Sequence, residues 1–469
     1  MNLENIHRIY FVGIGGIGMS ALARWFKKQG KTIAGYDRTR TSLCQQLESE
    51  GMEISYEDQV QSIPETFKQQ DPETLVIFTP AIPPDQTIFC YFRQNQFQVK
   101  KRSEVLGTIT RNHFTIAIAG THGKTTTSTL IAHIVKEANL NSVAFLGGIA
   151  TNYQSNLIIN ENPEDRTLKV IVEADEYDRS FLTLRPDIAV ITALDPDHLD
   201  IYGDEVEMKS SYSEFVNHVK KNGFLIIRKN LKNEILSPSN QHVQIKEYSL
   251  KNNPVRAENV RIEKEETRFN YVCPETVIEN IPYAFPGYHN IENAVAAITV
   301  GLLLDIREDI IKSALSTFRG IRRRFEYILY SDNLVFIDDY AHHPEEIRAF
   351  LHSVRSIFPE QKITAIFQPH LFTRTRDFAK SFGETLDLAD EVILLDIYPA
   401  REKPLPGVSS DLIFEKIKSA DKTKSTREGL FELLKQRDVE VLVTIGAGDI
   451  DQLVLPIMNL LKEKYEIPS

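Results

Sequence analysis

The sequence predicts an α/β protein made of three successive domains, each built around a mostly parallel sheet. The chain has 469 residues, which is too long for one hydrophobic core. Short β-branched apolar runs alternate with helical segments along its length, as in doubly wound folds. Glycine-rich or polar loops follow several of these runs, at the strand ends where ligands bind in such sheets.

The composition is that of an ordinary globular protein. Apolar residues make up 42% and charged residues 25% of the chain. Acidic residues outnumber basic ones, 65 to 54. The sequence has no stripe of basic residues of the kind that binds nucleic acid. Cys44, Cys90 and Cys273 are far apart and lack C-x-x-C spacing, so we expect neither a disulfide framework nor a zinc site. The absence of an apolar leader and of any apolar run of about 18 residues predicts a cytoplasmic protein without a membrane segment.

The first domain is expected over residues 1–110 and opens with a glycine-rich motif. A strand at Ile9–Val12 runs into Gly13-Ile14-Gly15-Gly16-Ile17-Gly18, and an apolar helix follows from Met19 to Phe26. A glycine loop between a strand and a helix is typical of dinucleotide-binding domains. The pattern alone accommodates NAD, FAD or any nucleotide diphosphate, and a close strand-to-helix turn without a ligand also explains it.

The next strand of this domain ends at a candidate ribose ligand. Thr32–Tyr36 leads to Asp37, about 20 positions after the last glycine, where an acidic side chain contacts a ribose hydroxyl in such folds. Further strands are expected at Leu75–Phe78, before a proline-rich loop, and near Val99. Asp37 is therefore predicted to lie near the ribose or the adjoining pocket.

The central domain, residues 111–318, begins with the motif around which the chain is organised. A β-branched run that includes Thr115 and Ile116 leads into Gly120-Thr-His-Gly123-Lys124-Thr125-Thr126-Thr127, and apolar residues at helical spacing follow. This is a shortened GxxGK[ST][ST] phosphate loop, since Ile118 stands where the strict pattern has a glycine. Backbone N–H groups and the helix dipole bind phosphate there. Lys124 would reach the outer phosphates and Thr125 would hold Mg²⁺; a tight turn with a chance lysine is the alternative.

Acidic residues follow two further strands of the central domain. The strand Lys169–Val172 leads into Glu173-Ala-Asp175-Glu176-Tyr-Asp178. Carboxylates at the end of a strand, in the same sheet as a phosphate loop, suit Mg²⁺, and Glu173 is the expected ligand. A solvated acidic loop is the alternative. The strand Asp187–Thr192 leads to Asp195-Pro-Asp197-His198-Leu-Asp200. His198 is a candidate for a second metal or for the γ-phosphate, although a lone histidine is more often a capped loop residue.

Two asparagines precede an alanine-rich helix expected at Ala294–Leu304. Asn290 and Asn293 are three residues apart and so share a helical face. Their amides carry both a donor and an acceptor, which suits a purine edge, and N-capping is the alternative for Asn290. The polar stretch Gln241–Glu266 is expected to be a surface excursion.

The third domain, residues 319–469, follows a basic hinge at Phe318–Phe325. A strand at Leu334–Ile337 and a helix from Glu345 come first. Further strands are expected at Ile363–Phe367, Val392–Leu395 and Val441–Ile445. The loops after these strands carry polar side chains that would gather at one edge of a doubly wound sheet.

Arg374 is the expected ligand of an amino-acid carboxylate. We place it in the loop after Ile363–Phe367, with His370, Thr373 and Arg376. A guanidinium can form two parallel charge-assisted hydrogen bonds to a carboxylate. The alternative is that Arg374 braces the loop or pairs with Asp377.

These motifs in this order resemble the Mur ligases, the ATP-dependent amide-bond-forming enzymes of peptidoglycan precursor synthesis. The resemblance covers essentially the whole chain: GIGGIGM in the first domain, GTHGKTT, EADE, DPDHLD and HNxxN in the second, and RRRF, DDYAHHP, QPHLFTRT and AREKPLPG in the third. One departure is Leu371, where many members carry arginine, and it shifts carboxylate binding toward Arg374.

The resemblance implies a Rossmann-like UDP-sugar domain, a P-loop ATP domain and a Rossmann-like amino-acid domain. It implies ATP and Mg²⁺, with Mn²⁺ as a substitute, and the substrates UDP-N-acetylmuramate and L-alanine. The lactyl carboxylate would attack the γ-phosphate, and the amine of alanine would attack the resulting acyl phosphate while domain closure excludes water. The loop QPHLFTRTRDF resembles alanine-adding members better than the recycling member that attaches a ready-made tripeptide, which stays the alternative. The oligomeric state, monomer or dimer, is left open.

The resemblance also implies a role for individual residues. The catalytic set is Lys124, Glu173, His198, His342 and Arg374, and the metal ligands are Thr125, Glu173 and His198. The ATP-binding set is Gly120, Thr121, His122, Gly123, Lys124, Thr125, Thr126, Asn290, Asn293, Arg324 and Asp339. The UDP-sugar set is Gly15, Gly16, Ile17, Gly18, Asp37, Ala81 and Arg102. The amino-acid set is His370, Arg374, Tyr398 and Ala400.

Two functions from other classes explain less of the chain. A nicotinamide-dependent oxidoreductase accounts for the segment from Gly13 to Asp37 but gives no role to the phosphate loop or Glu173. A non-catalytic nucleotide switch accounts for the phosphate loop but not for three α/β domains with polar loops. Absence of NADH binding would exclude the first, and substrate-stimulated ADP release separates an enzyme from the second.

Overall fold

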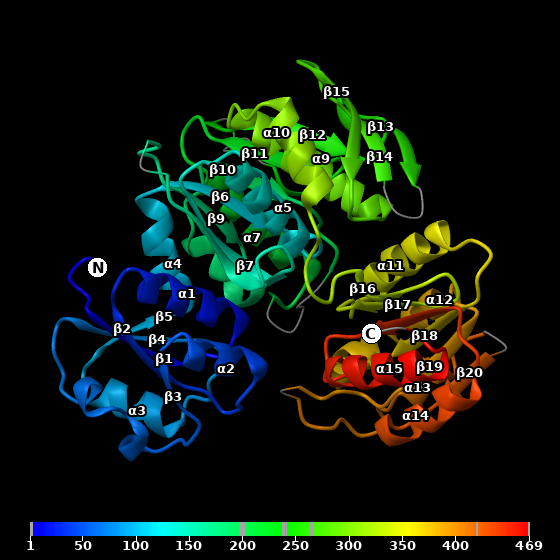
Figure 1. Cartoon of the computed structure of the whole chain (residues 1–469). Coiled ribbons are helices and arrows are strands. Elements are labelled where there is room, and N and C mark those ends of the chain that lie inside the picture. The colour runs from blue at the N-terminus through cyan, green and yellow to red at the C-terminus, as the bar shows by residue number, and fades with distance from the viewer. Residues whose placement is uncertain are drawn as a thin grey trace. The chain divides into compact units, whose positions relative to one another are not determined.

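The computed structural model describes residues 3–162, 164–196, 202–236, 240, 242–262, 267–400, 402–418 and 421–467. Its described strands form three sheets, of five, ten and six strands, with helices packed against them (Figure 1). The chain divides into two compact units. The first comprises Met1–Asn259, Phe269–Pro282 and Glu292–Arg319, and the second comprises Val260–Arg268, Tyr283–Ile291 and Gly320–Ser469.

The five-stranded sheet carries the glycine loop at the end of its central strand. Its order is β3-β2-β1-β4-β5, and β1 pairs in parallel with both neighbours. Ile9 and Phe11 face a core that includes α1, whereas Tyr10 and Val12 face a second core that includes α3. Burial on both faces explains why the strand is a continuous apolar run. The elements are β1 (Arg8–Val12), α1 (Ile17–Lys28), β2 (Thr32–Tyr36), α2 (Ser42–Ser49), β3 (Glu53–Ser55), η1 (Val60–Ser62), η2 (Glu65–Phe67), β4 (Thr74–Phe78), α3 (Thr87–Gln94), β5 (Gln98–Lys101) and α4 (Arg102–Arg111).

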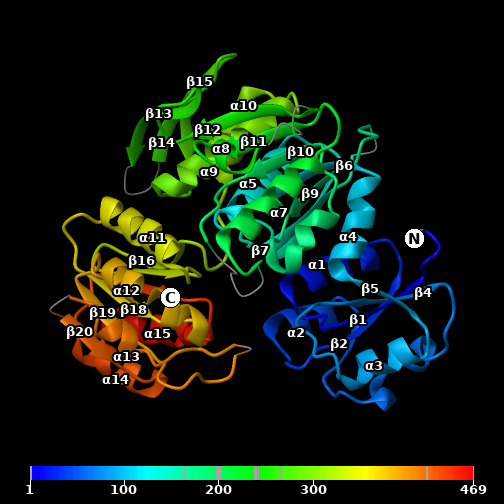
Figure 2. The same ribbon diagram turned by 180° about the vertical axis from the view of Figure 1, so that it is seen from behind.

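The ten-stranded sheet places the phosphate-loop strand near its middle, in the order β15-β14-β13-β12-β11-β10-β6-β9-β7-β8. β6 pairs in parallel with β10 and β9, and its residues Ile116 and Ile118 are fully buried. Tyr212 and Phe215 of α7 belong to the hydrophobic core on one face of this sheet. Figure 2 shows α7 in front of that face. The strands are β6 (Phe114–Ala119), β7 (Ser142–Ala150), β8 (Ser155–Asn160), β9 (Lys169–Glu173), β10 (Ile188–Ile191), β11 (Phe224–Arg228), β12 (Gln244–Ser249), β13 (Val255–Ile262), β14 (Thr267–Val272) and β15 (Val277–Tyr283). The helices are α5 (Lys124–Glu137), η3 (Tyr177–Thr183), α7 (Glu205–Asn217), α8 (Lys232–Ile235), α9 (Tyr288–Leu303) and α10 (Glu308–Thr317).

Two expectations for the central region are wrong. The described part of Gln241–Glu266 is not a surface excursion, because it forms β12 and β13 of the large sheet. Along β13 buried positions alternate with more exposed ones. Polar residues are tolerated at the more exposed positions, which explains the polar composition of this strand. The alanine-rich helix begins at Tyr288 rather than Ala294, and both Asn290 and Asn293 are therefore inside it.

The six-stranded sheet belongs to the second unit and has the order β16-β17-β21-β18-β19-β20. β16 is antiparallel to β17, whereas the other pairs are parallel. The doubly wound third region is thus confirmed, with an antiparallel edge strand. The elements are β16 (Glu326–Tyr330), β17 (Val335–Asp339), α11 (Pro344–Ile357), β18 (Ile363–Phe367), α12 (Phe372–Leu386), β19 (Glu391–Leu394), α13 (Asp411–Phe414), β20 (Asp421–Lys424), α14 (Arg427–Gln436), β21 (Val441–Ile445) and α15 (Asp451–Lys464).

The first unit holds the glycine-loop helix against the central sheet. The Trp25 ring of α1 lies edge-on to Phe145 of β7, with 5.8 Å between ring centroids. Buried Asn156 of β8 donates to the Ser20 hydroxyl at 2.8 Å and to the Ile17 carbonyl. These contacts fix α1 relative to β7 and β8. The limits expected for three domains, 1–110, 111–318 and 319–469, stay a prediction.

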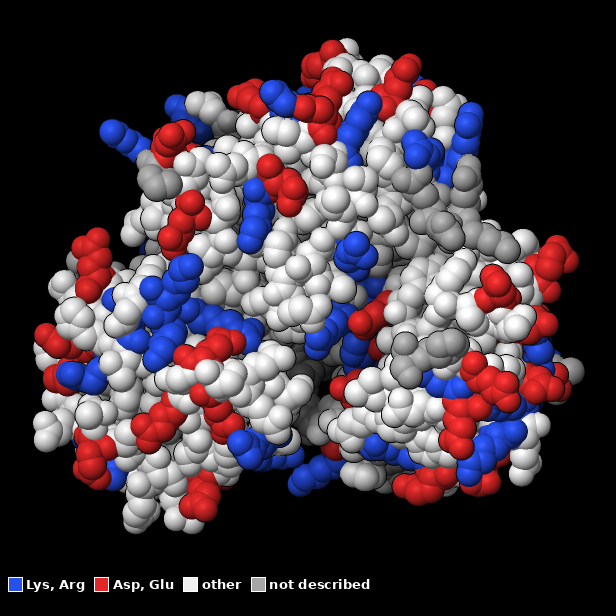
Figure 3. All heavy atoms as spheres, in the orientation of Figure 1, with Lys and Arg blue, Asp and Glu red and all other residues white. Residues whose placement is uncertain are grey.

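Charges of both signs are spread over the molecule. The formal net charge is -11, and acidic and basic side chains are interspersed on the face shown in Figure 3. In the described part of the chain, no helix combines the length and the hydropathy needed to cross a bilayer.

Candidate functional site

The predicted strand, phosphate loop and helix are confirmed by β6, the turn after it and α5. Gly120 and Gly123 have φ angles of +132° and +79°, which a residue with a β-carbon rarely adopts. A β-carbon on Gly120 would lie 2.3 Å from the Thr192 hydroxyl, and one on Gly123 would lie 2.8 Å from Asn293 Oδ1. Both glycines are therefore required by conformation and by close packing. Asn293, predicted for ATP, lies against the loop.

The end of β10 anchors this loop. The Thr121 N–H donates to the Ala193 carbonyl at 3.1 Å, and the Asp195 N–H donates to the Thr121 hydroxyl at 3.0 Å. The Thr192 hydroxyl donates to the His122 carbonyl, and His122 Nε2 lies 3.7 Å from Asp195 Oδ2. The loop is thus held in shape before any ligand binds.

Lys124, the first residue of α5, is held inside the loop by a carboxylate. Its Nζ donates to the Gly120 carbonyl at 2.6 Å and to Glu176 Oε1 at 2.8 Å. Burial alone would lower the pKa of Lys124, but the carboxylates of Glu176, Glu173 and Asp175 outweigh it and raise that pKa above its usual value. The ammonium group therefore stays charged at physiological pH. The sequence motif contained Glu176, but nothing in it distinguished this residue from its acidic neighbours.

The residues predicted to hold Mg²⁺ come from two adjoining elements. Thr125 and Thr126 are buried in the first turn of α5. Glu173 ends β9 opposite Ile118 of β6, and its Oε2 accepts the Gly147 N–H at 3.0 Å. A hydroxyl and a carboxylate are hard oxygen donors of the kind that binds Mg²⁺ together with phosphates and water.

A metal site built from protein ligands alone is not seen in the described ranges. No group of three His, Cys, Asp or Glu side chains in those ranges is placed to hold a metal ion. Asp197, His198, Asp200 and Arg401 lie outside the described residues. The predicted metal role of His198 stays a prediction.

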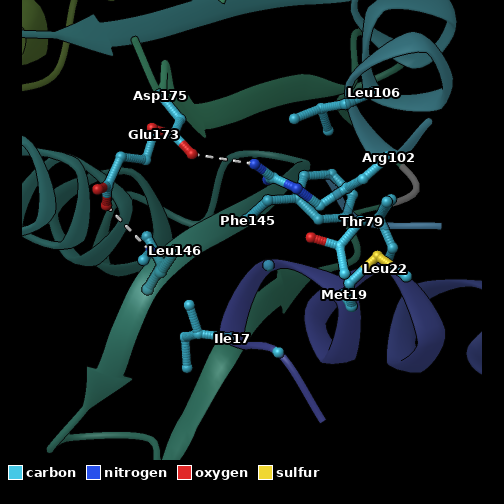
Figure 4. Close-up of a pocket in the computed structure, with 13 residues that line it drawn as sticks. Ile17, Met19, Leu22, Thr79, Arg102, Leu106, Phe145, Leu146, Glu173 and Asp175 are labelled. Carbon is cyan, nitrogen blue, oxygen red and sulfur yellow. Dashed lines mark hydrogen bonds and ion pairs between the residues drawn. The ribbon is translucent and has the colours of Figure 1, made fainter. Parts of the chain in front are cut away.

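A cavity of about 300 Å³ lies between the glycine loop and the acidic end of β9 (Figure 4). Arg102 of α4 crosses it and donates to Asp175 Oδ2 at 3.2 Å. A β-carbon on Gly18 would lie 2.6 Å from Arg102 Nη1, so this glycine makes room for the guanidinium at the amino end of α1. The lining residues are Gly16, Ile17, Gly18, Met19, Leu22, Thr79, Arg102, Leu106, Phe145, Leu146, Gly147, Glu173 and Asp175.

The cavity unites four of the residues predicted for a UDP-sugar with Glu173, which was predicted for the metal. Gly16, Ile17, Gly18 and Arg102 all line it. Thr79 lines it as well, although sequence reasoning chose Ala81 from the same loop. Ala81 is exposed in the turn after β4.

Asp37 braces the glycine loop. Its Oδ2 accepts the Gly15 N–H at 2.8 Å, and its Oδ1 accepts the Thr39 N–H at 3.1 Å. A β-carbon on Gly15 would lie 2.4 Å from Cys44 Sγ. The Gly15 N–H thus donates to the Asp37 side chain, and close packing against Cys44 leaves no room for a side chain at position 15. Contact of Asp37 with a ribose stays a prediction.

Asp37→Ala is expected to raise the KM for the sugar nucleotide about tenfold and to leave the KM for ATP largely unchanged. The substitution removes the acceptor that holds the Gly15 N–H, so the loop loses its ordered shape. Steady-state phosphate release at varied concentrations of each nucleotide measures both constants. A change confined to ATP would mean that the two nucleotide sites have been exchanged. Asp58→Ala is a control for the loss of a carboxylate elsewhere in the same sheet region, since Asp58 accepts the Ile88 N–H at 3.0 Å.

The second unit gathers further predicted residues at the carboxyl end of β17. Asp339 accepts the Phe325 N–H at 2.7 Å and the Ala341 N–H at 2.8 Å. Burial raises the pKa of Asp339 to about 6, although the Arg324 guanidinium and these N–H groups oppose the rise. The Arg324 guanidinium lies 5.2 Å from the centre of the Tyr340 ring. Asp339 thus shapes the turn that carries Arg324.

Three residues predicted for catalysis or amino-acid binding, His342, His370 and Tyr398, contact one another in sequence through their rings. The His342 ring lies edge-on to His370, with 5.9 Å between centroids, and His370 stacks on Tyr398 at 5.8 Å. The Leu371 N–H donates to the Tyr398 carbonyl at 3.0 Å. Ala400 is exposed two residues beyond Tyr398, with a φ of +49°. Sequence reasoning missed Glu346, whose Oε2 accepts the His342 N–H at 3.0 Å.

Arg374 lies in the first turn of α12 and not in a loop, which corrects the prediction. Phe372 starts this helix directly after Leu371, whose φ of +71° is strained for a residue with a side chain. Arg374 is buried, with 7% of its surface exposed. Asp377 accepts from Arg376 at 2.7 Å, so the acid proposed as an alternative partner is engaged by the neighbouring arginine.

Asn290 does not cap α9. It is the third residue of the helix, and its Nδ2 donates to the Pro286 carbonyl at 2.6 Å. The adjacent His289 contacts the Ser353 hydroxyl through Nδ1 at 3.1 Å. Burial lowers the pKa of His289 to about 4, and the Arg324 charge adds to this effect.

His289→Gln is expected to make the chain less sensitive to acid. Between pH 6.5 and 4 the unfolded chain binds a proton at this histidine that the folded chain does not, so stability falls as pH falls. The loss is at most on the order of 3 kcal/mol because the side chain keeps some exposure to solvent. Thermal midpoints at pH 4.5–7.5 compare the variant with the parent. The pKa of Asp339 is raised, so this carboxyl stabilises the fold as pH falls and offsets part of the loss in both proteins. Parallel pH profiles for the variant and the parent would therefore contradict the effect of His289.

Family models match the chain in three consecutive stretches. Residues 8–114 match "Mur ligase family, catalytic domain", residues 118–301 match "Mur ligase middle domain", and residues 323–448 match "Mur ligase, glutamate ligase domain". Each stretch contains one of the three sheets or most of it.

Curated relatives match the chain along almost its whole length. UDP-N-acetylmuramate–L-alanine ligase of Phocaeicola vulgatus is 45% identical over 99% of this chain and 100% of its own length. The protein of the same name from Cytophaga hutchinsonii is 45% identical over 99% of both chains.

Solved structures show the same fold. The crystal structure of UDP-N-acetylmuramate-alanine ligase from Thermotoga maritima superposes with a TM-score of 0.79 at 27% identity, covering 98% of this chain and 99% of that one. A murein peptide ligase from Psychrobacter arcticus shares the fold with a TM-score of 0.68 at 21% identity, covering 99% and 100%. With its phosphate loop, its glycine-loop cavity and relatives that match it from end to end, the chain belongs to the Mur ligase family.

Proposed function

We propose that this chain is an ATP-dependent ligase that joins L-alanine to the lactyl carboxylate of UDP-N-acetylmuramate in peptidoglycan precursor synthesis. The observation that carries the proposal is the position of Glu173, which lines the glycine-loop cavity and also ends the strand beside the phosphate loop. A sugar nucleotide and ATP can therefore bring their reacting groups together within one compact unit. Relatives with this name at 45% identity support the choice of substrates. The cytoplasm, where ATP is available, is the proposed location.

The residues of the first unit account for the phosphoryl-transfer step. Lys124 and the N–H groups at the start of α5 would bind the transferring phosphate and stabilise its charge. Thr125 and Glu173 would hold Mg²⁺, which supplies further charge neutralisation when bound. The lactyl carboxylate oxygen attacks the γ-phosphorus, the bond to the bridging oxygen breaks, and ADP leaves. His198 is a proposed partner of this phosphate.

The residues of the second unit would bind the amino acid. Arg374 is proposed to form two hydrogen bonds to the alanine carboxylate. His370, Tyr398, Ala400 and His342 are the other proposed residues of this site, and the His370 ring contacts those of His342 and Tyr398. The neutral amine then attacks the acyl carbon, and inorganic phosphate leaves the tetrahedral intermediate. Asn290, Asn293, Arg324 and Asp339 stay proposed ATP residues.

The phosphate-release assay that tests this function varies the acceptor. UDP-N-acetylmuramate, ATP and Mg²⁺ are held constant while L-alanine, L-serine, glycine and the recycling tripeptide are compared. We expect L-alanine to give the highest kcat/KM. Preference for the tripeptide would support the recycling function instead, and phosphate release that does not depend on any acceptor would contradict a ligase. A second arm without Mg²⁺, and one with Mn²⁺, tests the metal.

A further inference from the structure

Two neighbouring carboxylates of the first unit each pair with a cation, one in the glycine-loop cavity and one in the phosphate loop. We call residues 175–178 the acidic strap. Asp175 accepts from Arg102 at 3.2 Å in the glycine-loop cavity, as Figure 4 shows. The next residue, Glu176, accepts from Lys124 of the phosphate loop at 2.8 Å. One short segment therefore contacts both the glycine-loop cavity and the phosphate loop.

The two ion pairs differ in their exposure to solvent. The Lys124 and Glu176 side chains are 14% and 3% exposed, so water weakens their attraction little. The Asp175 side chain is 42% exposed, and its pair with Arg102 is correspondingly weaker. A second outer pair joins Lys101 to Asp178 at 3.0 Å. The strap thus has one strong inner attachment and two weaker outer ones.

The strap backbone is short and constrained. The buried Tyr202 hydroxyl donates to the Glu176 carbonyl at 2.6 Å, and the Phe181 N–H donates to the Asp175 carbonyl at 2.9 Å. Asp178 and Arg179 both have a φ of +54°, a conformation that is costly for residues with side chains. Displacement of the Asp175 carboxylate is therefore expected to move that of Glu176, because the two residues are adjacent in a constrained backbone.

We propose that the acidic strap couples nucleotide binding at the glycine-loop cavity to nucleotide binding at the phosphate loop. Each carboxylate of the strap pairs with a cation that a ligand phosphate would otherwise bind. The inference rests on the proposed function and concerns how its two phosphate-bearing substrates influence each other. A nucleoside diphosphate sugar that engages Arg102 releases Asp175, which loosens Glu176 and makes Lys124 available to a nucleoside triphosphate. By linkage the triphosphate strengthens sugar-nucleotide binding by the same factor.

Calorimetric titration of a non-hydrolysable ATP analogue, with and without saturating UDP-N-acetylmuramate, tests the coupling. In the parent protein we expect the sugar nucleotide to tighten analogue binding about fivefold or more. Glu176→Gln keeps the size of the side chain and removes its charge. It should tighten analogue binding about three- to tenfold when the sugar nucleotide is absent. The coupling factor, which is the ratio of the analogue's Kd without and with the sugar nucleotide, should then be close to one.

Matched variants separate the strap from general effects of charge. Glu207→Gln removes the same charge from an exposed carboxylate, 3.5 Å from Arg179, and should leave analogue binding and coupling as in the parent. Asp175→Asn acts on the outer pair and should tighten sugar-nucleotide binding while lowering the coupling. Because Asp175 is more exposed, this variant tests the proposal even if Glu176→Gln does not fold, which the thermal midpoint reveals.

Three results would overturn the coupling. They are a parent coupling factor of one, weaker analogue binding in folded Glu176→Gln, and unchanged coupling in Asp175→Asn. The proposed ligase function fails separately, through the absence of alanine-dependent phosphate release. An enzyme that binds both nucleotides with coupling but releases no phosphate would keep the inference and lose the function. A lack of UDP-N-acetylmuramate binding would overturn both.

Discussion

Replacing Lys124 with alanine is expected to lower alanine-dependent phosphate release by about a thousandfold or more, because no other side chain in the loop brings a permanent positive charge to the transferring phosphate. The backbone cradle should survive, since the anchors from β10 remain although the Gly120 carbonyl loses the Lys124 donor. Phosphate release and circular dichroism together measure the effect. Activity within a few-fold of the parent would contradict the assignment of the phosphate loop.

The stability of this variant needs its own control, because Lys124 Nζ donates to Glu176 Oε1 and the Glu176 side chain is only 3% exposed. Breaking a buried pair by removing one partner costs roughly 3 kcal/mol. We therefore expect Lys124→Ala to melt earlier than the parent and the double variant Lys124→Ala/Glu176→Gln to recover most of the loss. Activity should stay absent in both. Recovery of activity with stability would show that the lysine acts through folding alone.

Arg374→Lys is expected to raise the KM for alanine about ten- to a hundredfold while the KM for ATP changes little. Lysine keeps the charge but cannot form two parallel hydrogen bonds to a carboxylate. Loss of that geometry in a partly desolvated site costs roughly 1.5–3 kcal/mol. Steady-state kinetics with varied alanine at saturating ATP and sugar nucleotide measure the effect.

The burial of Arg374 makes a structural role a serious alternative. A residue that only braces the start of α12, next to the strained Leu371, would lower the thermal midpoint and all activity when replaced. Arg376→Lys is the matched control, because Arg376 is exposed and pairs with Asp377 on the same helix. An unchanged KM for alanine in a stable and active Arg374→Lys variant would refute the carboxylate clamp.

Local sequence was sufficient for the buried parallel strands. Thr32–Tyr36, Ile363–Phe367 and Val441–Ile445 have the predicted bounds. Each is an apolar run buried along most of its length, so its identity does not depend on which strand pairs with it. The polar stretch that forms β12 and β13 was not recognised, because a strand that is only partly buried can have a polar composition.

The phosphate loop illustrates what a motif can specify about a site. Gly120, Gly123 and Lys124 act through backbone conformation and sequence adjacency, so strand, loop and helix could be predicted together. Arg374 shows the limit. Its residue type suggested a carboxylate ligand, but its place in a helix and its burial depend on packing that sequence does not display.

By itself, the sequence determined the α/β class, the phosphate loop and the family resemblance, since these follow from short runs of residues that are adjacent in the chain. Only the tertiary structure decided that Asp37 holds Gly15, that Arg102 pairs with Asp175, and that Glu176 rather than another acid holds Lys124. Each of these contacts joins residues more than 20 positions apart. Their formation depends on strand order and on the direction of each side chain, and both are set by how the sheet and helices pack together to bury their apolar faces.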